Sequence, residues 1–279
     1  MSNKNDALGT RMKQYEYITR NYLTRKLPVI IRLDGKAFHS FTRGFKRPFD
    51  EIFIKSMQDT MKYLCENIQG CVLGYCQSDE ITLVLVDYQS REASAWFDNN
   101  IQKMASVSAS MATVAFNKFF AYEVWNYESE WKCSLTPQSV EIQNRHKKYV
   151  DVLHAAIAKG AMFDSRVFTL PKEEVANCLI WRQQDATRNS IQSVGQANFS
   201  QNQLECKNCS DIQDMLMLEK GINWNDFPTH LKRGSCCIKK PFKINDGTDQ
   251  EAIRNKWVID TEIPIFTQNK NYVNELVFI

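Results

Sequence analysis

The apolar positions of the chain follow two rhythms, and the first consists of short continuous runs. Residues 27–33 are apolar and rich in β-branched side chains, which predicts a buried strand. Residues 72–76 and 81–86 are two further runs, and the polar residues 77–80 between them predict a hairpin. Residues 163–170 form another run that a proline ends, so we expect a strand there as well.

The second rhythm has the helical period. Residues 51–68 place apolar side chains about one turn apart, which predicts an amphipathic helix with one face on a sheet. The side chains of that face are Phe53, Met57, Met61, Leu64, Cys65 and Ile68. Residues 93–119 repeat the pattern and predict a second helix. We expect a helical excursion at about 120–160, a mostly helical polar segment over 172–235, and strands from 236 onward.

The order strand, helix, hairpin, helix, strand indicates the fold class. It is the order of a split βαβ, or ferredoxin-like, arrangement, the palm-like layout of many polymerases and nucleotide cyclases. We therefore predict an α+β protein with a palm-like catalytic domain over residues 1–170. Residues 171–279 would form a mostly helical C-terminal extension.

The composition narrows the class of protein. The chain has 279 residues, 43% of them hydrophobic, which is enough for a substantial core. Its formal net charge is only +3, so any nucleic-acid binding must come from local basic patches. No apolar run approaches the roughly 18 residues of a membrane helix, so we expect a cytoplasmic protein with no membrane partner. The nine cysteines of such a chain are expected to be reduced thiols.

Two acidic positions could form one metal site. Asp34 follows the first predicted strand, and Asp79 lies in the predicted hairpin with Glu80 beside it. If the strands are neighbours, the two carboxylates point into one crevice at a sheet end. Mg²⁺ prefers such hard oxygen ligands, and divalent ions stabilise the charge that develops during nucleotidyl transfer. Each motif taken singly is more typical of a solvated turn, and only the two together favour a metal site as much as two turns.

Four motifs in order resemble those of the tRNA-histidine guanylyltransferase family, over about residues 7–240. They are LPVIIRLDGKAFHSFTRGFKRPFD (27–50), GYCQSDEITLVL (74–85), FDSRVFTLP (163–171) and WRQQDATRNS (181–190). The resemblance implies 3′-to-5′ nucleotide addition to the 5′ end of tRNA. It also implies two Mg²⁺ ions, ATP or GTP as the activating nucleotide, nucleoside triphosphates as substrates, and a homotetramer.

The resemblance also assigns residues. Asp34, the main-chain carbonyl of Gly35, and Asp79 correspond to metal ligands. Glu80, by its position next to Asp79, could complete the catalytic site or orient a ligand. Arg182, Arg188 and Asn189 fall in a tRNA-binding segment, which makes residues 171–279 the expected tRNA-binding region. The nucleotide-binding segments correspond to Asp34, Gly35, Lys36, Ala37, Phe38, His39, Ser78 and Asp79.

The residues themselves extend that set. Gly35 permits close approach, so the loop after it could present N–H groups to a triphosphate whose charge Lys36, Lys46 and Arg47 would screen. Phe38 is expected in the core rather than beneath a base, and His39 is either a phosphate or ribose contact or a structural residue. Around residues 90–95 the chain keeps only one basic position of the family, Arg91, and Lys103 could substitute as a triphosphate contact.

The largest departure from the family concerns the choice of RNA. The histidine-specific enzymes carry His-Ile-Asn-Asn where this chain has Thr187, Arg188, Asn189 and Ser190, so only Asn189 is kept. The pattern favours a guanylyltransferase-like protein that repairs 5′-truncated tRNAs by templated addition. The alternatives are addition of a single 5′ G to histidine tRNA, a palm-type nucleotide cyclase, and a non-catalytic RNA-binding protein.

Two further groups of residues have open roles. Cys206 and Cys209 with Cys236 and Cys237 invite a structural zinc reading, but the second pair lacks the usual spacing, so we expect no zinc. The basic clusters are either tRNA phosphate contacts or solvated charge. They comprise residues 145–148, Lys232-Arg233 and Lys239-Lys240.

Overall fold

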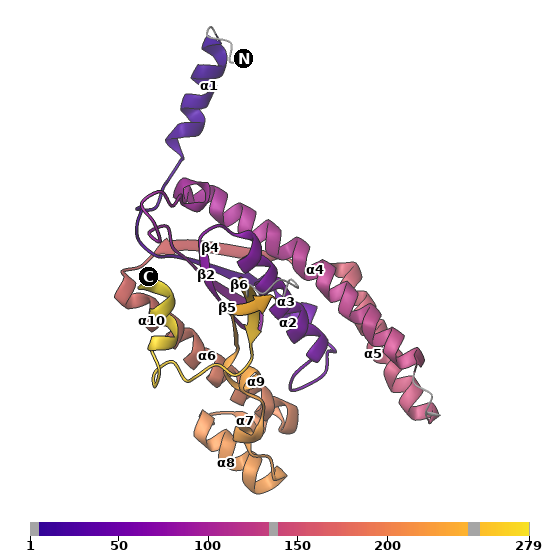
Figure 1. The fold of residues 1–279 in the computed structure, drawn as a ribbon. Coiled ribbons are helices and arrows are strands. Elements are labelled where there is room, and N and C mark those ends of the chain that lie inside the picture. Colours follow the sequence, from indigo (N-terminus) through magenta and orange to yellow (C-terminus); the bar gives the residue numbers. More distant parts are fainter. Residues whose placement is uncertain (1–5, 134–138, 245–251, 279) are drawn as a thin grey trace.

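The computed structural model describes residues 6–133, 139–244 and 252–278 (Figure 1). Its centre is a six-stranded antiparallel sheet in the order β4-β1-β3-β2-β5-β6. The strands are β1 (Val29–Gly35), β2 (Cys71–Gln77), β3 (Glu80–Leu85), β4 (Phe163–Thr169), β5 (Ser235–Ile244) and β6 (Ala252–Asp260). The predicted strands and hairpin are therefore present, and helices and an antiparallel sheet share one fold.

The first predicted helix is α3 (Glu51–Asn67), which connects β1 to β2. It begins where the Asp50 side chain accepts a hydrogen bond from Phe53 N, which satisfies a backbone donor that the helix leaves free. Met57, Met61 and Leu64 of its apolar face are fully buried against the sheet.

The bounds predicted for the second helix, 93–119, are wrong at both ends. A short 3₁₀ turn, η1 (Trp96–Asn99), has left-handed backbone at Phe97, Asp98 and Asn99, which an α-helix cannot contain. The helix α4 (Ile101–Cys133) begins after it, and the Asn100 side chain accepts from Lys103 N. No helix-breaking residue follows residue 119, so α4 continues into the segment from about 120 that was expected to be a separate helical excursion. With α5 (Val140–Lys159) it forms a projecting helical arm (Figure 1).

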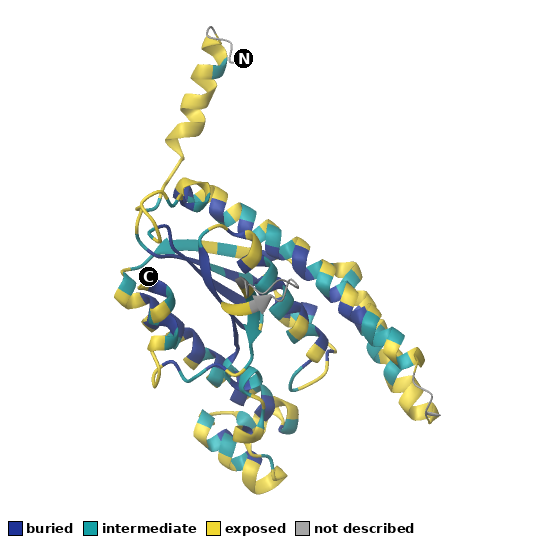
Figure 2. Ribbon diagram, in the orientation of Figure 1, coloured by how far each residue is buried: buried dark blue, intermediate teal, exposed yellow. Residues whose placement is uncertain are grey.

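The sheet is covered on both faces, as Figure 2 shows by the buried strands between helices. One face packs on α3 and α4 through residues that include Ile31, Leu33 and Phe116. The other packs on α6 (Lys172–Asn198) and α10 (Asn271–Val277), through residues that include Ile30, Tyr75, Val84, Leu179 and Val273. Alternate residues of each strand supply the two cores.

The C-terminal region has two parts. A third core around Trp224 joins α6 to α7 (Gln201–Leu204), α8 (Cys209–Lys220), η2 (Trp224–Asp226) and α9 (Thr229–Arg233). After it, β5 and β6 extend the central sheet beyond β2, so the extension is not purely helical. At the other end of the chain, α1 (Ala7–Ile18) buries no residue and projects from the body, whereas α2 (Phe38–Phe41) is a buried turn after β1 (Figures 1 and 2).

Candidate functional site

The two acidic motifs meet at one end of the sheet. Asp34 lies near the end of β1, directly opposite Glu80, the first residue of β3. The Gly35 N–H donates to the carbonyl of Asp79 at 3.1 Å, so the backbone itself holds the two motifs together. Strand pairing therefore meets the condition under which the carboxylates of Asp34 and Asp79 share a crevice.

The turn that carries Asp79 is tight and strained. Gln77 pairs with Glu80, which leaves two residues for the turn, and Ser78 adopts a left-handed φ of 49°. Burial and then the negative charge of Asp34 raise the pKa of Asp79, against the hydrogen bonds that its own backbone N–H and the Ser78 side chain provide. Asp79 is thus held in a buried place where hydrogen bonds only partly compensate its negative charge.

This arrangement fits a divalent cation. Among the described residues, neither Asp34 nor Asp79 forms an ion pair with a basic side chain. Two such carboxylates beside the carbonyl of Gly35 offer hard oxygen donors, which Mg²⁺ prefers while it keeps several waters. A Cβ on Gly35 would lie 2.3 Å from the Phe38 ring, which explains why this position holds a residue without a side chain.

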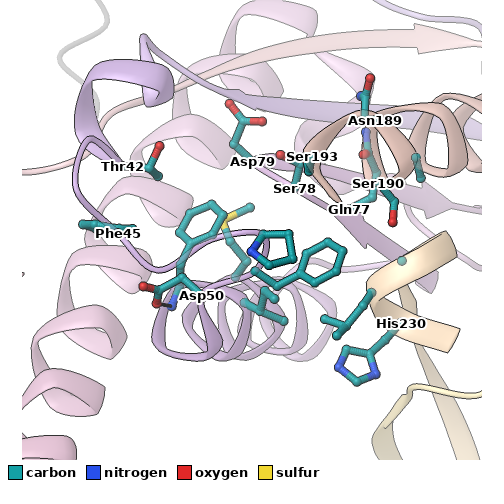
Figure 3. Close-up of a pocket in the computed structure, with 18 of the residues that line it drawn as sticks. Thr42, Phe45, Asp50, Gln77, Ser78, Asp79, Asn189, Ser190, Ser193 and His230 are labelled. Atoms are coloured by element: carbon teal, nitrogen blue, oxygen red, sulfur yellow. Dashed lines mark hydrogen bonds between the residues drawn. The ribbon is translucent and has the colours of Figure 1, made fainter. Parts of the chain in front are cut away.

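A cavity of about 450 Å³ opens beside the turn (Figure 3). Four segments line it: the loop and helix between residues 38 and 58, the turn at 76–79, the middle of α6, and the junction of α9 with β5. Its polar lining includes Thr42, Lys46, Asp50, Gln58, Gln77, Ser78, Asp79, Asn189, Ser190, Ser193, Gln196 and His230. The volume is in the range of small-molecule sites.

The cavity gathers some of the predicted nucleotide-binding residues and not others. It is lined by Phe38, His39, Lys46, Ser78, Asp79 and the predicted tRNA-binding residue Asn189. Phe38 is buried among four other phenylalanines, as expected of a core residue. The N–H groups of Gly35 and Lys36 donate to the carbonyl oxygens of Asp79 and Met162, so the prediction that this loop presents N–H groups to a triphosphate now concerns the residues that follow Lys36. The exposed Ala37 does adopt the left-handed conformation of such a loop, with φ 55°.

Lys46 and Lys103 have different surroundings. The Lys46 ammonium lies over the rings of Tyr127 and Tyr149, 4.7 and 4.6 Å from their centroids, at the edge of the cavity. Lys103 lies in the first turn of α4, its ammonium 5.8 Å from the Phe97 ring, and does not line the cavity. The structure therefore brings Lys46, and not Lys103, to the cavity.

Arg182 does not lie on an RNA-accessible surface. It is only 7% exposed, its Nε donates to Glu80 Oε1 at 2.7 Å, and a second nitrogen donates to Asp185 Oδ2 at 2.7 Å. Burial raises the pKa of Glu80, and the charge and hydrogen bond of Arg182 oppose that rise. Arg188, which is exposed, pairs with Asp185, and Asn189 donates to the same carboxylate at 3.4 Å. Of the three predicted tRNA contacts, Arg182 is buried and instead holds Glu80, next to the turn that carries Asp79.

Two arginines beside the carboxylates were not predicted as site residues. Arg32 and Arg166 are directly opposite each other in β1 and β4, two positions along from Asp34 and Asp164. Alternate strand residues share a face, so both arginines lie on the face that carries Asp34 and Glu80. Arg32 also lies 5.5 Å from the Trp181 ring centroid. The period-two spacing from Asp34 was a signal that could have found Arg32.

His230 is a second residue that sequence reasoning missed. It lies at the wall of the cavity, and within the described part of the chain its buried Nδ1 has no hydrogen-bond partner. Burial lowers the pKa of this histidine. No sequence signal marked it, because α9 is brought to the cavity by the third core.

The four cysteines considered for zinc are not together. Cys236 and Cys237 are buried in β5 on opposite faces of the sheet, in separate cores, whereas Cys206 is exposed after α7. Within residues 6–133, 139–244 and 252–278, no three His, Cys, Asp or Glu side chains form a metal-binding group. In the same ranges, no helix has the length and apolar character needed to cross a membrane.

Comparison with known proteins agrees with the motifs. Residues 9–171 match the family profile described as tRNAHis guanylyltransferase. A bacterial tRNA(His) guanylyltransferase-like protein solved with ATP is 41% identical, with a TM-score of 0.77 over 97% of this chain and 99% of that one. A second such structure, with GTP, is 38% identical, with a TM-score of 0.76 over 98% and 100%.

A curated relative from yeast supports the same assignment. The tRNA(His) guanylyltransferase of Saccharomyces cerevisiae is 25% identical over 82% of this chain and 89% of its own length. The family profile covers more than half of the 279 residues, including both acidic motifs. The chain belongs to the tRNAHis guanylyltransferase family, and it is a nucleotidyltransferase of that family.

Proposed function

We propose that this protein adds nucleotides in the 3′-to-5′ direction to the 5′ end of tRNA, directed by the opposite strand, and so repairs 5′-truncated tRNAs. In the first step a 5′-phosphate oxygen attacks the α-phosphorus of ATP or GTP and pyrophosphate leaves. In the second, the 3′-hydroxyl of an incoming nucleoside triphosphate attacks the activated 5′ phosphorus, losing its proton, and the nucleoside monophosphate leaves. The observation that carries the proposal is the backbone pairing that brings Asp34 next to Asp79, which lines the cavity.

Metal binding is assigned to the residues that carry uncompensated negative charge. Asp34, the Gly35 carbonyl and Asp79 would hold two Mg²⁺ ions, which supply positive charge to the phosphate oxygens when bound. The sheet with α3 and α4 would act as a palm-like platform, which fixes the two carboxylates through β1 and the hairpin. Glu80 acts through Arg182, which holds the turn.

Substrate binding is divided between two regions. The arginines Arg32 and Arg166, on the face of Asp34, would bind the triphosphate, since guanidinium groups match phosphate oxygens. The cavity would receive the nucleoside portion of a nucleotide, with Asn189, Ser190 and His230 as polar contacts. The structural neighbours solved with ATP and with GTP support nucleotide binding in this fold.

Templated repair is favoured over histidine-specific addition by residues on α6. Two residues of the segment that departs from the His-Ile-Asn-Asn motif line the cavity beside Asp79: Asn189, which is kept, and Ser190, which replaces the last asparagine. The change at Ser190 would alter RNA or nucleotide selection while Asp34 and Asp79 stay in position. The greater identity to the bacterial guanylyltransferase-like proteins than to the yeast enzyme points the same way.

The second candidate function is addition of a single G to histidine tRNA. It is favoured by the curated relatives of this name in yeasts, Drosophila melanogaster and Dictyostelium discoideum, at 23–27% identity. The proteins compared above are guanylyltransferases or guanylyltransferase-like proteins and not nucleotide cyclases. The test offers tRNAs with intact and shortened 5′ ends to the protein with Mg²⁺ and each nucleoside triphosphate in turn.

Growth only opposite a pairing base supports templated repair, whereas G added to histidine tRNA regardless of the opposite base supports the second candidate. A cyclic nucleotide made without RNA would contradict both.

We further infer a cytoplasmic homotetramer. The exposed apolar side chains of α1, Leu8, Tyr15 and Ile18, offer a surface to a second copy. Analytical ultracentrifugation of the full chain with and without α1 tests that assembly.

A further inference from the structure

Trp181 of α6 keeps a large aromatic surface open to solvent. Its side chain is 53% exposed, although the next residue, Arg182, is buried. Trp224 shows how a tryptophan of the core is held in this protein, since it is 6% exposed and its indole N–H donates to Ser190 Oγ at 3.1 Å. A large ring gains most free energy from burial, so the exposure of Trp181 has to be explained by something other than packing.

The ring of Trp181 lies among arginines next to Asp34. The guanidinium carbons of Arg32 and Arg182 are 5.5 and 4.4 Å from its centroid. Arg32 precedes Asp34 by two residues in β1, which is about 7 Å along the strand. Trp181 is not among the described residues that line the cavity. It therefore stands outside the cavity, within one nucleotide of the assigned metal ligand.

The sheet beside Trp181 is open. In β4, an edge strand, Asp164 and Arg166 are opposite Asp34 and Arg32, and both of their side chains are 56% exposed. All four lie on the same face of the sheet, because alternate strand residues share a face. We call these four residues and Trp181 the shelf. It is a charged surface with an aromatic ring at one side and Asp34 at its end.

The shelf and the cavity give separate approaches to the two carboxylates. Asp79 lines the cavity, whereas Asp34 belongs to the shelf. Each step of the proposed reaction joins a nucleotide to the 5′ end of an RNA, so two bases have to be held near the same metal site. Because the cavity is assigned to the nucleoside of a nucleotide, the shelf is the surface that remains for the end of the RNA.

An open ring suits the end of a polymer better than a free nucleotide. A small molecule gains its affinity from an enclosed site with several walls, which the cavity offers and the shelf does not. A terminal RNA base is already held in place by the rest of the chain, so one stacking surface is enough. Stacking tolerates every base, which suits a protein that accepts RNAs with different 5′ ends.

We propose that Trp181 stacks on the 5′-terminal base of the RNA and so positions its 5′ phosphate at Asp34 and Asp79. This inference rests on the proposed function, which supplies RNA as a substrate. The ligand chemistry is a nucleobase, which a free nucleoside triphosphate also carries, so the experiment has to distinguish the two sources.

Trp181 also has a possible structural role as a cover over the buried pair of Arg182 and Glu80. Its ring lies against the Arg182 guanidinium and limits the access of water to it. That role needs apolar bulk and no aromatic surface, so leucine would fill it and alanine would not. Stacking on a base needs the flat ring, which phenylalanine keeps and leucine lacks. The two roles therefore predict opposite orders for these variants.

The experiment uses the full chain and a tRNA shortened by one nucleotide, with 2-aminopurine as its 5′-terminal base. The fluorescence of 2-aminopurine falls when it stacks on an aromatic ring. Trp181→Ala, Trp181→Phe and Trp181→Leu are compared with the wild type. The matched control is Trp125→Ala on α4, which removes a tryptophan that is 63% exposed. Circular dichroism verifies folding, and titration gives the Kd of each complex with Mg²⁺ present.

The same titration is repeated with an RNA that lacks the 5′-terminal base but keeps its sugar and phosphate. A third arm uses the triphosphate of 2-aminopurine riboside without RNA. The abasic RNA completes a cycle in which either stacking partner is removed alone or both together. Such a cycle isolates the contact from any general effect of the substitution on the fold.

We expect the wild type to quench the terminal 2-aminopurine and Trp181→Ala not to do so. Trp181→Ala should bind the RNA about tenfold more weakly, as should Trp181→Leu, whereas Trp181→Phe should recover most of the loss. The wild type should lose about tenfold on the abasic RNA, and Trp181→Ala should lose less than about twofold, because its stacking partner is already absent. Trp125→Ala should behave as the wild type, and the free triphosphate should respond equally to the wild type and Trp181→Ala.

Four outcomes would overturn the inference. They are quenching that persists in Trp181→Ala, full recovery by leucine, an equal loss in Trp125→Ala, and quenching of the free triphosphate that depends on Trp181. The second would assign the ring to covering Arg182, and the fourth would assign it to the nucleotide. If Trp181 quenches the RNA base but the wild type adds no nucleotide, the proposed function fails while the stacking contact holds. If templated addition occurs and Trp181→Ala binds RNA normally, only the stacking contact fails.

Discussion

Arg182 and Glu80 form an ion pair at 2.7 Å that is almost completely buried, and it joins α6 to the residue that directly follows Asp79. A buried pair is costly to desolvate, so its value lies in geometry as much as in stability. Asp79 precedes Glu80 and faces the cavity, so the pair fixes the turn that presents Asp79. The same arginine reaches Asp185, which in turn holds Arg188 and Asn189.

Removal of Arg182 should be severely destabilising. Arg182→Gln leaves the buried carboxylate of Glu80 without its cation, which costs about 3–5 kcal/mol in the free energy of unfolding. Urea denaturation measures that loss. Arg188→Gln, an exposed change on the same helix, is the control and should cost under about 1 kcal/mol.

The double variant Arg182→Gln with Glu80→Gln separates the pair from the rest of the helix. Its loss should be clearly smaller than the sum of the two single losses, because no unpaired charge stays buried. Additive losses would contradict the assignment. Nucleotide addition should fall in all three variants, while tRNA affinity falls little, since Arg182 is not placed on the RNA surface.

The ionised carboxylate of Asp79 should lower the free energy of unfolding of the protein when no divalent cation is bound. Its pKa is raised by burial and by Asp34, so the folded protein binds that proton more tightly than the unfolded chain does. The sign follows: the carboxylate form opposes folding, and stability falls as pH rises from the ordinary carboxyl value, near 4, through the raised one. Without divalent cations at pH 7, Asp79→Asn should therefore raise the melting temperature, and the difference should vanish at acid pH.

The same variant tests the metal site. Mg²⁺ should raise the melting temperature of the wild type and much less that of Asp79→Asn, because a ligand that binds only the folded state stabilises it. Nucleotide addition should be lost by at least about a hundredfold. Asp151→Asn, an exposed change on α5, is the control and should alter neither property. A Mg²⁺ response equal in both proteins would remove Asp79 from the ligand set.

The strands were predictable because each is buried on both faces or ended by a strong turn signal. β2 and β3 appeared within one residue of their expected bounds, and α3 began at the predicted residue because Asp50 caps it. The start of α4 was not predictable from periodicity. The left-handed residues Phe97–Asn99 keep apolar spacing in the sequence while they break the helix.

The site was predictable as far as strand pairing decides it. Asp34 and Asp79 meet because β1 and β3 are neighbours, which the order of elements already favoured. Whether Arg182 contacts tRNA or Glu80 depends on which side of α6 faces β3. The motif alone does not reveal that orientation. The cavity needed α6 and α9, more than a hundred residues beyond the turn, and such long-range packing left no local signal.

Arg32 and Arg166 should determine nucleotide affinity. If they bind the triphosphate, Arg32→Gln and Arg166→Gln should each raise the KM for the nucleoside triphosphate about tenfold, the value of a charge-assisted phosphate contact. Arg→Lys should restore only part of it, because a lysine lacks the planar fork. Steady-state kinetics on a pre-activated tRNA measures the effect, with the exposed Arg145→Gln on α5 as control. Equal KM values in all variants would exclude the two arginines from triphosphate binding.

Gly35 should not tolerate a side chain, because a Cβ at this position would clash with the ring of Phe38. A Cβ at this position would lie 2.3 Å from Cδ2 of Phe38, whose ring is locked among Phe41, Phe116 and Phe163. Gly35→Ala should cost about 1–3 kcal/mol of unfolding free energy through overpacking, and it should shift the β1 carbonyl assigned to the metal. The free energy of unfolding, measured by denaturation, and the rate of nucleotide addition should therefore both fall. Adding Phe38→Leu removes the clashing ring edge, so the double variant should recover stability relative to Gly35→Ala alone. If stability recovers and activity does not, the carbonyl geometry, rather than the core, is what the glycine protects.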